Sequence, residues 1–193
     1  ERLAGGDRQS IVRFGEVTAR LVIGGEHRIV VRVPDDAVEG SLTIESQGTS
    51  SSVRSCNLGK AIAEDLHPVA SPAVDSEGNI YTTRSGTRGE EVPVSVFKID
   101  GSNNTHAFAS EIVNPTGLVV APSGELLVSG RNNGTVYTVT PDGSVSTYAE
   151  GMGVATGMAM DGDGNLYVGD RTGTIFKIAP DRQIFVFATV EPS

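Results

Sequence analysis

The sequence contains two neighbouring stretches that repeat each other, NPTGLVVAPSGELLVSGRNNGTVYTVTPDG at 114–143 and VATGMAMDGDGNLYVGDRTGTIFKIAPD at 154–181. Matching positions lie 39 to 40 residues apart, as Gly124 and Gly164 illustrate. An earlier copy begins near Pro72 with PAVDSEGNIYTTRSG. Three consecutive copies indicate a repeat architecture.

Each copy consists of short apolar or alternating runs, such as GLVVA, ELLVSG, GTVYTVT and VSTYA, separated by PSG, NNG and PDG. The runs are typical of strands, and the separators are typical of tight turns in which Gly adopts a positive φ. Four short strands in a unit of this length are typical of a β-propeller blade. The sequence therefore predicts an all-β fold, with three four-stranded blades over 72–193 and equivalent turns at Gly78, Gly124 and Gly164.

The stretches GLVVAPSGELLVSGRNNGTVYTV and GMAMDGDGNLYVGDRTGTIFKI resemble NHL-type blades, as also found in gluconolactonase-like and virginiamycin-lyase-like propellers; the resemblance covers residues 66–193. Rings normally need four to eight blades, so three cannot close. We therefore expect the parent protein to continue to six blades, and the missing blades of the parent chain to be a partner of this segment. Ile184, Val186 and Phe187 should lie on a sheet face that a fourth blade covers, and the segment alone should dimerise or aggregate.

Residues 1–60 show a different pattern, with expected strands at 11–14, 19–23, 28–33, 41–45 and 53–58 and no helical periodicity. The order VRFG, ARLV, RIVVRVPDDAVEGSLTIES resembles the later part of an IPT/TIG module, which is an immunoglobulin-like β-sandwich. The resemblance implies an incomplete module, because the opening strands are missing. Residues 61–71 are the expected linker to the blades.

Composition restricts the partners of the 193-residue chain, whose formal net charge is −9. Residues 67–193 hold 14 acidic and 7 basic residues, which disfavours nucleic acid and anionic membranes as partners. No apolar run is long enough for a membrane span, and no export signal is visible. The chain has no initiator Met and too few blades to close a ring, so it is expected to be an excised segment. The single Cys56 excludes an internal disulfide and is expected to be a half-buried, unreactive thiol.

Catalytic and metal-binding motifs are scarce. The sequence lacks G-x-S-x-G, a phosphate-binding Gly loop and H-E-x-x-H. The stretch DGDGN at 161–165 alternates like a calcium loop but lacks the Gly and Glu that such a loop needs at its sixth and twelfth positions. We therefore expect a structural turn there, and neither a catalytic residue nor a metal ligand is assigned.

Propeller geometry predicts a ligand surface instead. The loop between the second and third strands of a blade opens on the same face as the connector to the next blade. The connectors contribute His67, Asn114, Thr116 and Thr156, and the loops contribute Arg84, Arg88, Arg131, Asp170 and Arg171. Guanidinium groups pair bidentately with carboxylate or phosphate, so this surface suits an anionic ligand. Alternatively, the arginines end strands and pair with neighbouring Asp or Glu.

The first copy also carries an insertion at this surface, because SGTRGEEVPVS makes its loop six or seven residues longer than in the other copies. Inserted loops on a rigid repeat scaffold often determine binding specificity. Alternatively, the insertion is a loop extension that the fold tolerates and that has no role in binding, which explains it equally well.

We therefore expect a non-catalytic binding or interaction module of a bacterial secreted or envelope protein, located in the extracellular space, the periplasm or the cell envelope. A small anionic ligand, a carbohydrate or a protein is the expected partner, without a cofactor. The alternatives are a metal-dependent hydrolase resembling gluconolactonases and a lyase resembling virginiamycin-lyase propellers, with a divalent cation such as Ca²⁺ or Zn²⁺. The gluconolactonase resemblance implies Asn ligands in PN(G/D)-type turns, but NPTG and VATG place Thr116 and Thr156 there.

Overall fold

The computed structural model describes residues 10–25, 27–64, 66 and 72–190. The chain forms two compact units, Glu1–Ala61 and Ile62–Ser193, and each is described by itself. All regular secondary structure in the described residues is β-strand, which confirms the predicted all-β class. This part of the chain contains no helix that could span a membrane.

The first unit is a six-stranded antiparallel sheet with strand order β3-β2-β1-β4-β5, in which β6 also pairs with β4. Val12, Phe14 and Ala19 form its small core. All five expected strands are present, together with an additional two-residue β5, while the IPT/TIG assignment stays a prediction. The strands are β1 (Ile11–Phe14), β2 (Val17–Gly24), β3 (Ile29–Arg32), β4 (Gly40–Ser46), β5 (Thr49–Ser50) and β6 (Arg54–Cys56).

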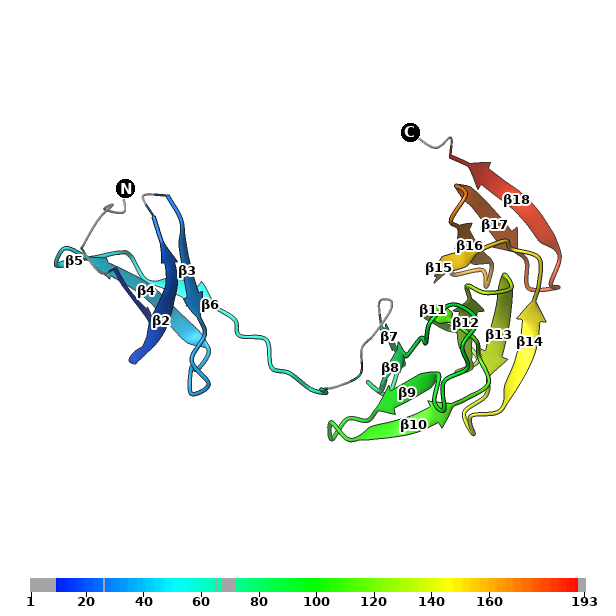
Figure 1. Cartoon of the computed structure of the whole chain (residues 1–193), viewed down its shortest axis with the longest axis horizontal. Helices are drawn as coiled ribbons and strands as arrows, with labels where there is room; N and C mark the ends of the chain where they lie inside the picture. The colour runs from blue at the N-terminus through cyan, green and yellow to red at the C-terminus, as the bar shows by residue number, and fades with distance from the viewer. Residues whose placement is uncertain (1–9, 26, 65, 67–71, 191–193) are drawn as a thin grey trace. The chain divides into compact units, whose positions relative to one another are not determined.

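The second unit consists of three four-stranded antiparallel sheets, whose strands pair in chain order. The sheets fan out with β7, β11 and β15 on the inner side and β10, β14 and β18 on the outer side (Figure 1). This arrangement confirms the predicted blades. Blade 1 is β7 (Ala73–Val74), β8 (Ile80–Thr83), β9 (Val96–Ile99) and β10 (Thr105–Ala109); blade 2 is β11 (Pro115–Val120), β12 (Leu126–Gly130), β13 (Thr135–Val139) and β14 (Val145–Ala149); blade 3 is β15 (Ala155–Met160), β16 (Leu166–Asp170), β17 (Thr174–Ile178) and β18 (Ile184–Thr189).

The turns between first and second strands follow the prediction. Gly78, Gly124 and Gly164 have φ values of 83°, 85° and 82°, which a residue with a Cβ rarely adopts. In the DGDGN stretch, Asp161 Oδ1 accepts hydrogen bonds from the N–H groups of Asp163 and Asn165, at 3.0 and 2.8 Å. This stretch is therefore a closed structural turn.

Each blade has a near face toward the preceding blade and a far face toward the following one. Leu126 and Val128 on the near face of blade 2 pack with Tyr81 on the far face of blade 1. The corresponding near-face residues of blade 3, Leu166 and Val168, pack against blade 2 in the same way. Burial of these apolar side chains is the main force that holds consecutive blades together.

Close backbone approach accompanies this packing. A Cβ on Gly117 of β11 would lie 2.4 Å from the carbonyl oxygen of Thr156 on β15. Since no side chain fits at that distance, glycine is required where the innermost strands of blades 2 and 3 meet.

Candidate functional site

Two kinds of loop lie at one end of the blades, which we call the upper end. They are the loops between the second and third strands and the connectors from one blade to the next. The loop of blade 1 spans 84–95, whereas those of blades 2 and 3 span only 131–134 and 171–173. The predicted insertion is therefore located at this end.

Asn114 anchors the long loop of blade 1. Its side chain is only 1% exposed, and its Oδ1 accepts a hydrogen bond from the Gly89 N–H at 2.7 Å. Its Nδ2 donates to Ser85 Oγ at 3.0 Å and to the carbonyls of Gly86 and Thr87 at 3.1 and 2.9 Å. One buried amide therefore fixes four residues of the inserted loop against the start of blade 2.

Backbone hydrogen bonds connect the connectors to the shorter loops. The Arg131 N–H donates to the Asn114 carbonyl at 3.0 Å, and the Arg171 N–H donates to the Val154 carbonyl at 3.2 Å. Because both bonds start at the first residue of a loop, blades 2 and 3 hold their arginines in equivalent positions.

Hydroxyl groups link neighbouring strands at the upper end. Thr116 Oγ1 donates to the Ala155 carbonyl at 3.1 Å, and Ser129 Oγ donates to the Thr156 carbonyl at 2.8 Å. Thr156 Oγ1 donates to the Gly169 carbonyl at 2.9 Å. Ser129 was not predicted as a functional residue. The only signal in the sequence is its place at the end of the second strand.

Asp170 closes the loop of blade 3. Its Oδ1 accepts a hydrogen bond from the Val154 N–H at 2.7 Å, and its Oδ2 accepts one from the Thr172 N–H at 3.2 Å and another from the Thr172 hydroxyl. The hydroxyl bond of Thr172 and these N–H groups hold the pKa of Asp170 below its usual value, although burial opposes them. The carboxylate is thus ionised at neutral pH, and both of its oxygens accept hydrogen bonds from the loop and the connector.

Four arginine side chains extend from these loops without a carboxylate partner. Arg84, Arg88 and Arg171 are exposed, and Arg131 is half-buried. Within the described residues, no ion pair within 4.0 Å and no side-chain hydrogen bond engages any of the four. The alternative expectation, that they pair with neighbouring Asp or Glu, is therefore not what this part of the chain shows.

Upper-end carboxylates do not neutralise these groups directly. Glu90 Oε2 instead accepts hydrogen bonds from the Thr87 Oγ1 and N–H, at 2.6 and 2.9 Å. The Thr87 hydroxyl, followed by its N–H, lowers the pKa of Glu90. Glu111 and Glu150 are exposed on the connectors and lie beyond ion-pair distance of the described arginines.

The opposite, lower end of the blades is strongly acidic. Its single arginine, Arg182, lies 3.9 Å from the centre of the Tyr148 ring and donates to the Tyr148 carbonyl at 2.8 Å. The free guanidinium groups are thus separated from most of the negative charge of the unit. The lower-end carboxylates are Asp75, Glu77, Asp100, Glu125, Asp142, Asp161, Asp163 and Asp181.

Two surface grooves lie away from the arginines. One of about 410 Å³ runs between the outer strands of blades 1 and 2, beside Phe108 and Val145. Another of about 450 Å³ lies at the lower end, beside Tyr81 and Pro122. No arginine lines either groove.

The structure thus brings eight of the nine predicted site residues to one end. Asn114 and Asp170 use their polar atoms to position the loops, whereas the hydroxyls of Thr116 and Thr156 bond to strand carbonyls, and the contact of all four with a ligand stays a prediction. His67 lies outside the described residues. In the part of the chain that is described, no three His, Cys, Asp or Glu residues converge closely enough to hold a metal ion.

No protein-family model matches the chain, and no curated protein matches it either. Solved structures do match. Catalytically inactive virginiamycin B lyase from Staphylococcus aureus, solved with quinupristin, is 15% identical with a TM-score of 0.53, and the match covers 83% of this chain and 55% of the lyase.

Two further structures extend this likeness. A putative gluconolactonase is 18% identical with a TM-score of 0.53, and the match covers 98% of this chain and 81% of the gluconolactonase. An auxiliary nutrient binding protein from Bacteroides thetaiotaomicron is 13% identical with a TM-score of 0.54, and the match covers 95% of this chain and 53% of the binding protein. At these identities the likeness shows the β-propeller fold alone. The chain spans only 55% to 61% of the length of the lyases it matches.

Proposed function

We propose that the second unit is a binding module that takes a carboxylate- or phosphate-bearing ligand at its upper end. The observation that carries the proposal is the group of four arginines, from loops of all three blades, that lack a carboxylate partner among the described residues. Charge-assisted hydrogen bonds to guanidinium are about twice as strong as neutral ones. Anchoring by Asn114 and Asp170 reduces the ordering cost of binding.

The charge of the unit restricts the ligand. An anionic group on a small molecule, a carbohydrate or a protein would suit the guanidinium groups of the upper end. Nucleic acid is disfavoured, because residues 67–193 hold 14 acidic and 7 basic residues. We further propose a bacterial secreted or envelope location, which rests on the resemblance of the first unit to an IPT/TIG module.

The fold itself leaves catalysis open, because the matching structures include a lyase, a putative gluconolactonase and a nutrient binding protein. A non-catalytic role without a cofactor is the proposal that the site favours. A metal-dependent hydrolase resembling gluconolactonases would need metal ligands at the positions of Thr116 and Thr156, and a lyase would need a basic residue such as His67 beside a cation. Both hydroxyls donate to backbone carbonyls, and a neutral hydroxyl is a weak ligand for a divalent cation.

Calorimetric titration of the chain tests the proposal. The probes are phosphate, citrate and galacturonate, with neutral galactose as the control, all at one ionic strength. We expect the three anions to bind and neutral galactose not to bind. Arg131→Gln and Arg171→Gln should each weaken it by about tenfold, which corresponds to the loss of one charge-assisted hydrogen bond. Arg54→Gln, at an exposed position of the first unit, should have no effect. Anion affinities equal in all variants would contradict the proposal.

A further inference from the structure

The outer strands of blades 1 and 2 border a groove of about 410 Å³. Phe108 and Val145 provide apolar walls, and both side chains are half-buried. Glu111 is the one charged residue among the described residues that line the groove. Both walls belong to strands that the structure describes in full, β10 and β14. The groove thus combines an apolar surface with a single carboxylate.

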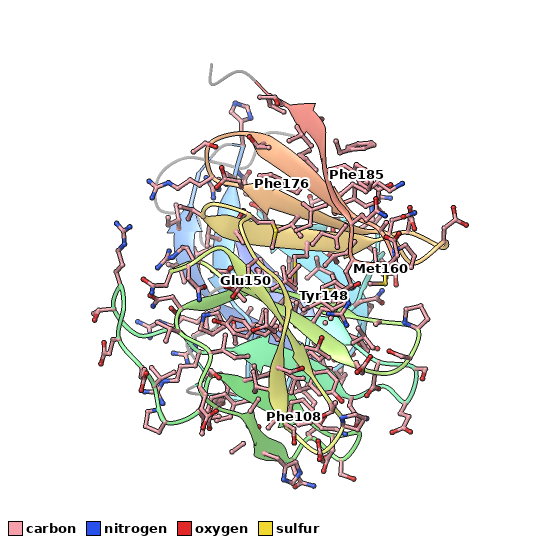
Figure 2. The ribbon with its side chains drawn as sticks, turned by 90° about the vertical axis from the view of Figure 1, so that its right-hand side faces the viewer. Phe108, Tyr148, Glu150, Met160, Phe176 and Phe185 are labelled. Carbon is pink, nitrogen blue, oxygen red and sulfur yellow. The ribbon has the colours of Figure 1, made fainter. Side chains whose placement is uncertain are left out.

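An arginine side chain occupies the matching place between blades 2 and 3. Arg182 lies in the turn between β17 and β18, with its Cζ 3.9 Å from the centre of the Tyr148 ring, and its Nη1 donates to the Tyr148 carbonyl at 2.8 Å. Figure 2 shows Phe108 and Tyr148 on the outer strands of blades 1 and 2, where they hold equivalent positions. The protein itself therefore shows a guanidinium group seated on the aromatic ring at such a gap.

Gly143 takes the place of Arg182 at the groove between blades 1 and 2. The two residues close equivalent turns, because their N–H groups donate to the carbonyls of Thr140 and Ala179, both at 2.8 Å. A Cβ on Gly143 would lie 2.3 Å from the Phe108 carbonyl oxygen, so this turn has no room for a side chain. The groove therefore lacks the arginine that the chain supplies at the next gap.

Glu111 is the second difference between the two gaps. Its equivalent in blade 2 is Gly151, with a φ of 91°, whereas Glu111 adopts a φ of 67° in spite of its side chain. Strained backbone at a residue other than glycine is typical of functional sites. The Glu111 carboxylate is exposed and has no ion pair or hydrogen bond in the described part of the chain. Since Gly143 lies against the Phe108 carbonyl, this carboxylate is the acceptor that the groove offers to a cation.

The strand beside the groove is also open to a partner. β10 forms one edge of its sheet and pairs only with β9 among the described strands. An extended segment of another protein can pair with such an edge and place one side chain in a neighbouring pocket. The charge of the unit favours a basic segment, because residues 67–193 hold 14 acidic and 7 basic residues.

We propose that this groove binds an arginine side chain from an extended segment of another protein. The guanidinium group pairs with the Glu111 carboxylate, and the apolar stem of the arginine lies against Phe108 and Val145. Guanidinium groups form strong hydrogen bonds with carboxylates and stack on aromatic rings, while their stems cover apolar surface. A partner's arginine thus does at this groove what Arg182 does within the chain. The inference does not depend on the anion site of the upper end.

An NMR titration of the backbone N–H signals of the chain tests the proposal. The probe is the peptide Ser-Gly-Arg-Gly-Ser with blocked ends, and the control peptide has neutral citrulline in place of the arginine. We expect the arginine peptide to cause saturable shifts at Ser110, Glu111 and Ser144, with a dissociation constant on the order of 1 mM. The citrulline peptide should cause none. Absence of saturable shifts at the groove, or equal shifts with both peptides, would overturn the proposal.

Variants of the chain separate the groove from general attraction to an acidic protein. Glu111→Gly removes the carboxylate and introduces the residue that blade 2 has there, so its urea midpoint should stay unchanged or rise. It should weaken binding of the arginine peptide roughly fivefold, as expected for one exposed ion pair. Ser144→Arg adds a guanidinium group at an exposed position of the groove and should weaken binding as well.

Glu150→Gln is the matched control, because it removes an equal charge from the connector of blade 2, outside the groove. This variant should bind the arginine peptide as tightly as wild type does. Unchanged affinity in Glu111→Gly would overturn the proposal. An equal loss in Glu150→Gln would overturn it too, since the net charge of the unit would then explain the binding.

Discussion

Replacement of Asn114 by Ala should destabilise the second unit and release its long upper loop. The substitution removes the side-chain bonds to Gly89, Ser85, Gly86 and Thr87, so the Gly89 N–H and the carbonyls of Gly86 and Thr87 lose this partner. Because Nδ2 has only two N–H donors, the four contacts amount to three hydrogen bonds, and each lost bond costs about 1 kcal/mol. The φ of Asn114 is 49°, a conformation that costs Ala about 1 kcal/mol more than Asn or Gly. The expected loss is about 4 kcal/mol.

Urea denaturation followed by circular dichroism measures this loss. Asn114→Gly separates the two contributions, because Gly keeps the positive φ but loses the hydrogen bonds, and it should lose about 3 kcal/mol. Anion affinity should fall in both variants, since the loop that carries Arg88 is no longer held. A loss below about 1 kcal/mol in Asn114→Ala would show that the amide does not anchor the loop.

Three further outcomes are expected. Gly117→Ala should lower the urea midpoint by an amount equivalent to about 1–3 kcal/mol, because its Cβ would lie 2.4 Å from the Thr156 carbonyl oxygen; an unchanged midpoint would show that the blades can move apart freely. Hydrogen bonds hold the pKa of Asp161 below its ordinary value of 3.8, and the bond from the Asn165 side chain has the largest effect. The contribution of Asp161 to the stability of the fold is therefore complete above pH 3.8 and is lost as the pH falls through the lower pKa of the folded state. Unfolding measured from about pH 5 to about pH 2 should therefore show a shallower loss of stability in Asp161→Asn, and an identical slope would contradict this cause. The chain should not hydrolyse sugar lactones with added Zn²⁺, Ca²⁺ or Mn²⁺, whereas turnover that a chelator abolishes and metal restores would contradict this expectation.

The repeat could be predicted from the sequence because each blade is built from local signals. Alternating Val and Tyr runs specify strands, and Gly124 and Gly164 specify turns whose backbone only glycine adopts without strain. Constant spacing then identifies the blades, because one sheet cannot bury its faces alone. The turn at Asp161 was predictable for the same reason, since all of its partners lie within six residues.

The candidate site was predictable only in part. Strand order alone places the four arginines at the upper end, whereas their lack of carboxylate partners depends on side-chain geometry that spacing does not contain. Asn114 resembles a ligand contact in the sequence, yet it binds residues 25 to 29 positions earlier in the chain. The exposed face of β18 was also misassigned. Ile184 and Val186 pair with Ile178 and Phe176, whereas alternation along the strand places Phe187 on the opposite face, together with Phe185.

The central claim is that the arginines of the upper end bind an anion together. Its most direct measurement is an NMR titration of the arginine side-chain Nε–H signals with citrate at constant ionic strength. The account predicts that the signals of Arg84, Arg88, Arg131 and Arg171 shift and saturate with one common dissociation constant. The signal of Arg182, which is held on the Tyr148 ring, should stay unchanged. Equal, unsaturated shifts of all arginines in the chain would contradict the claim.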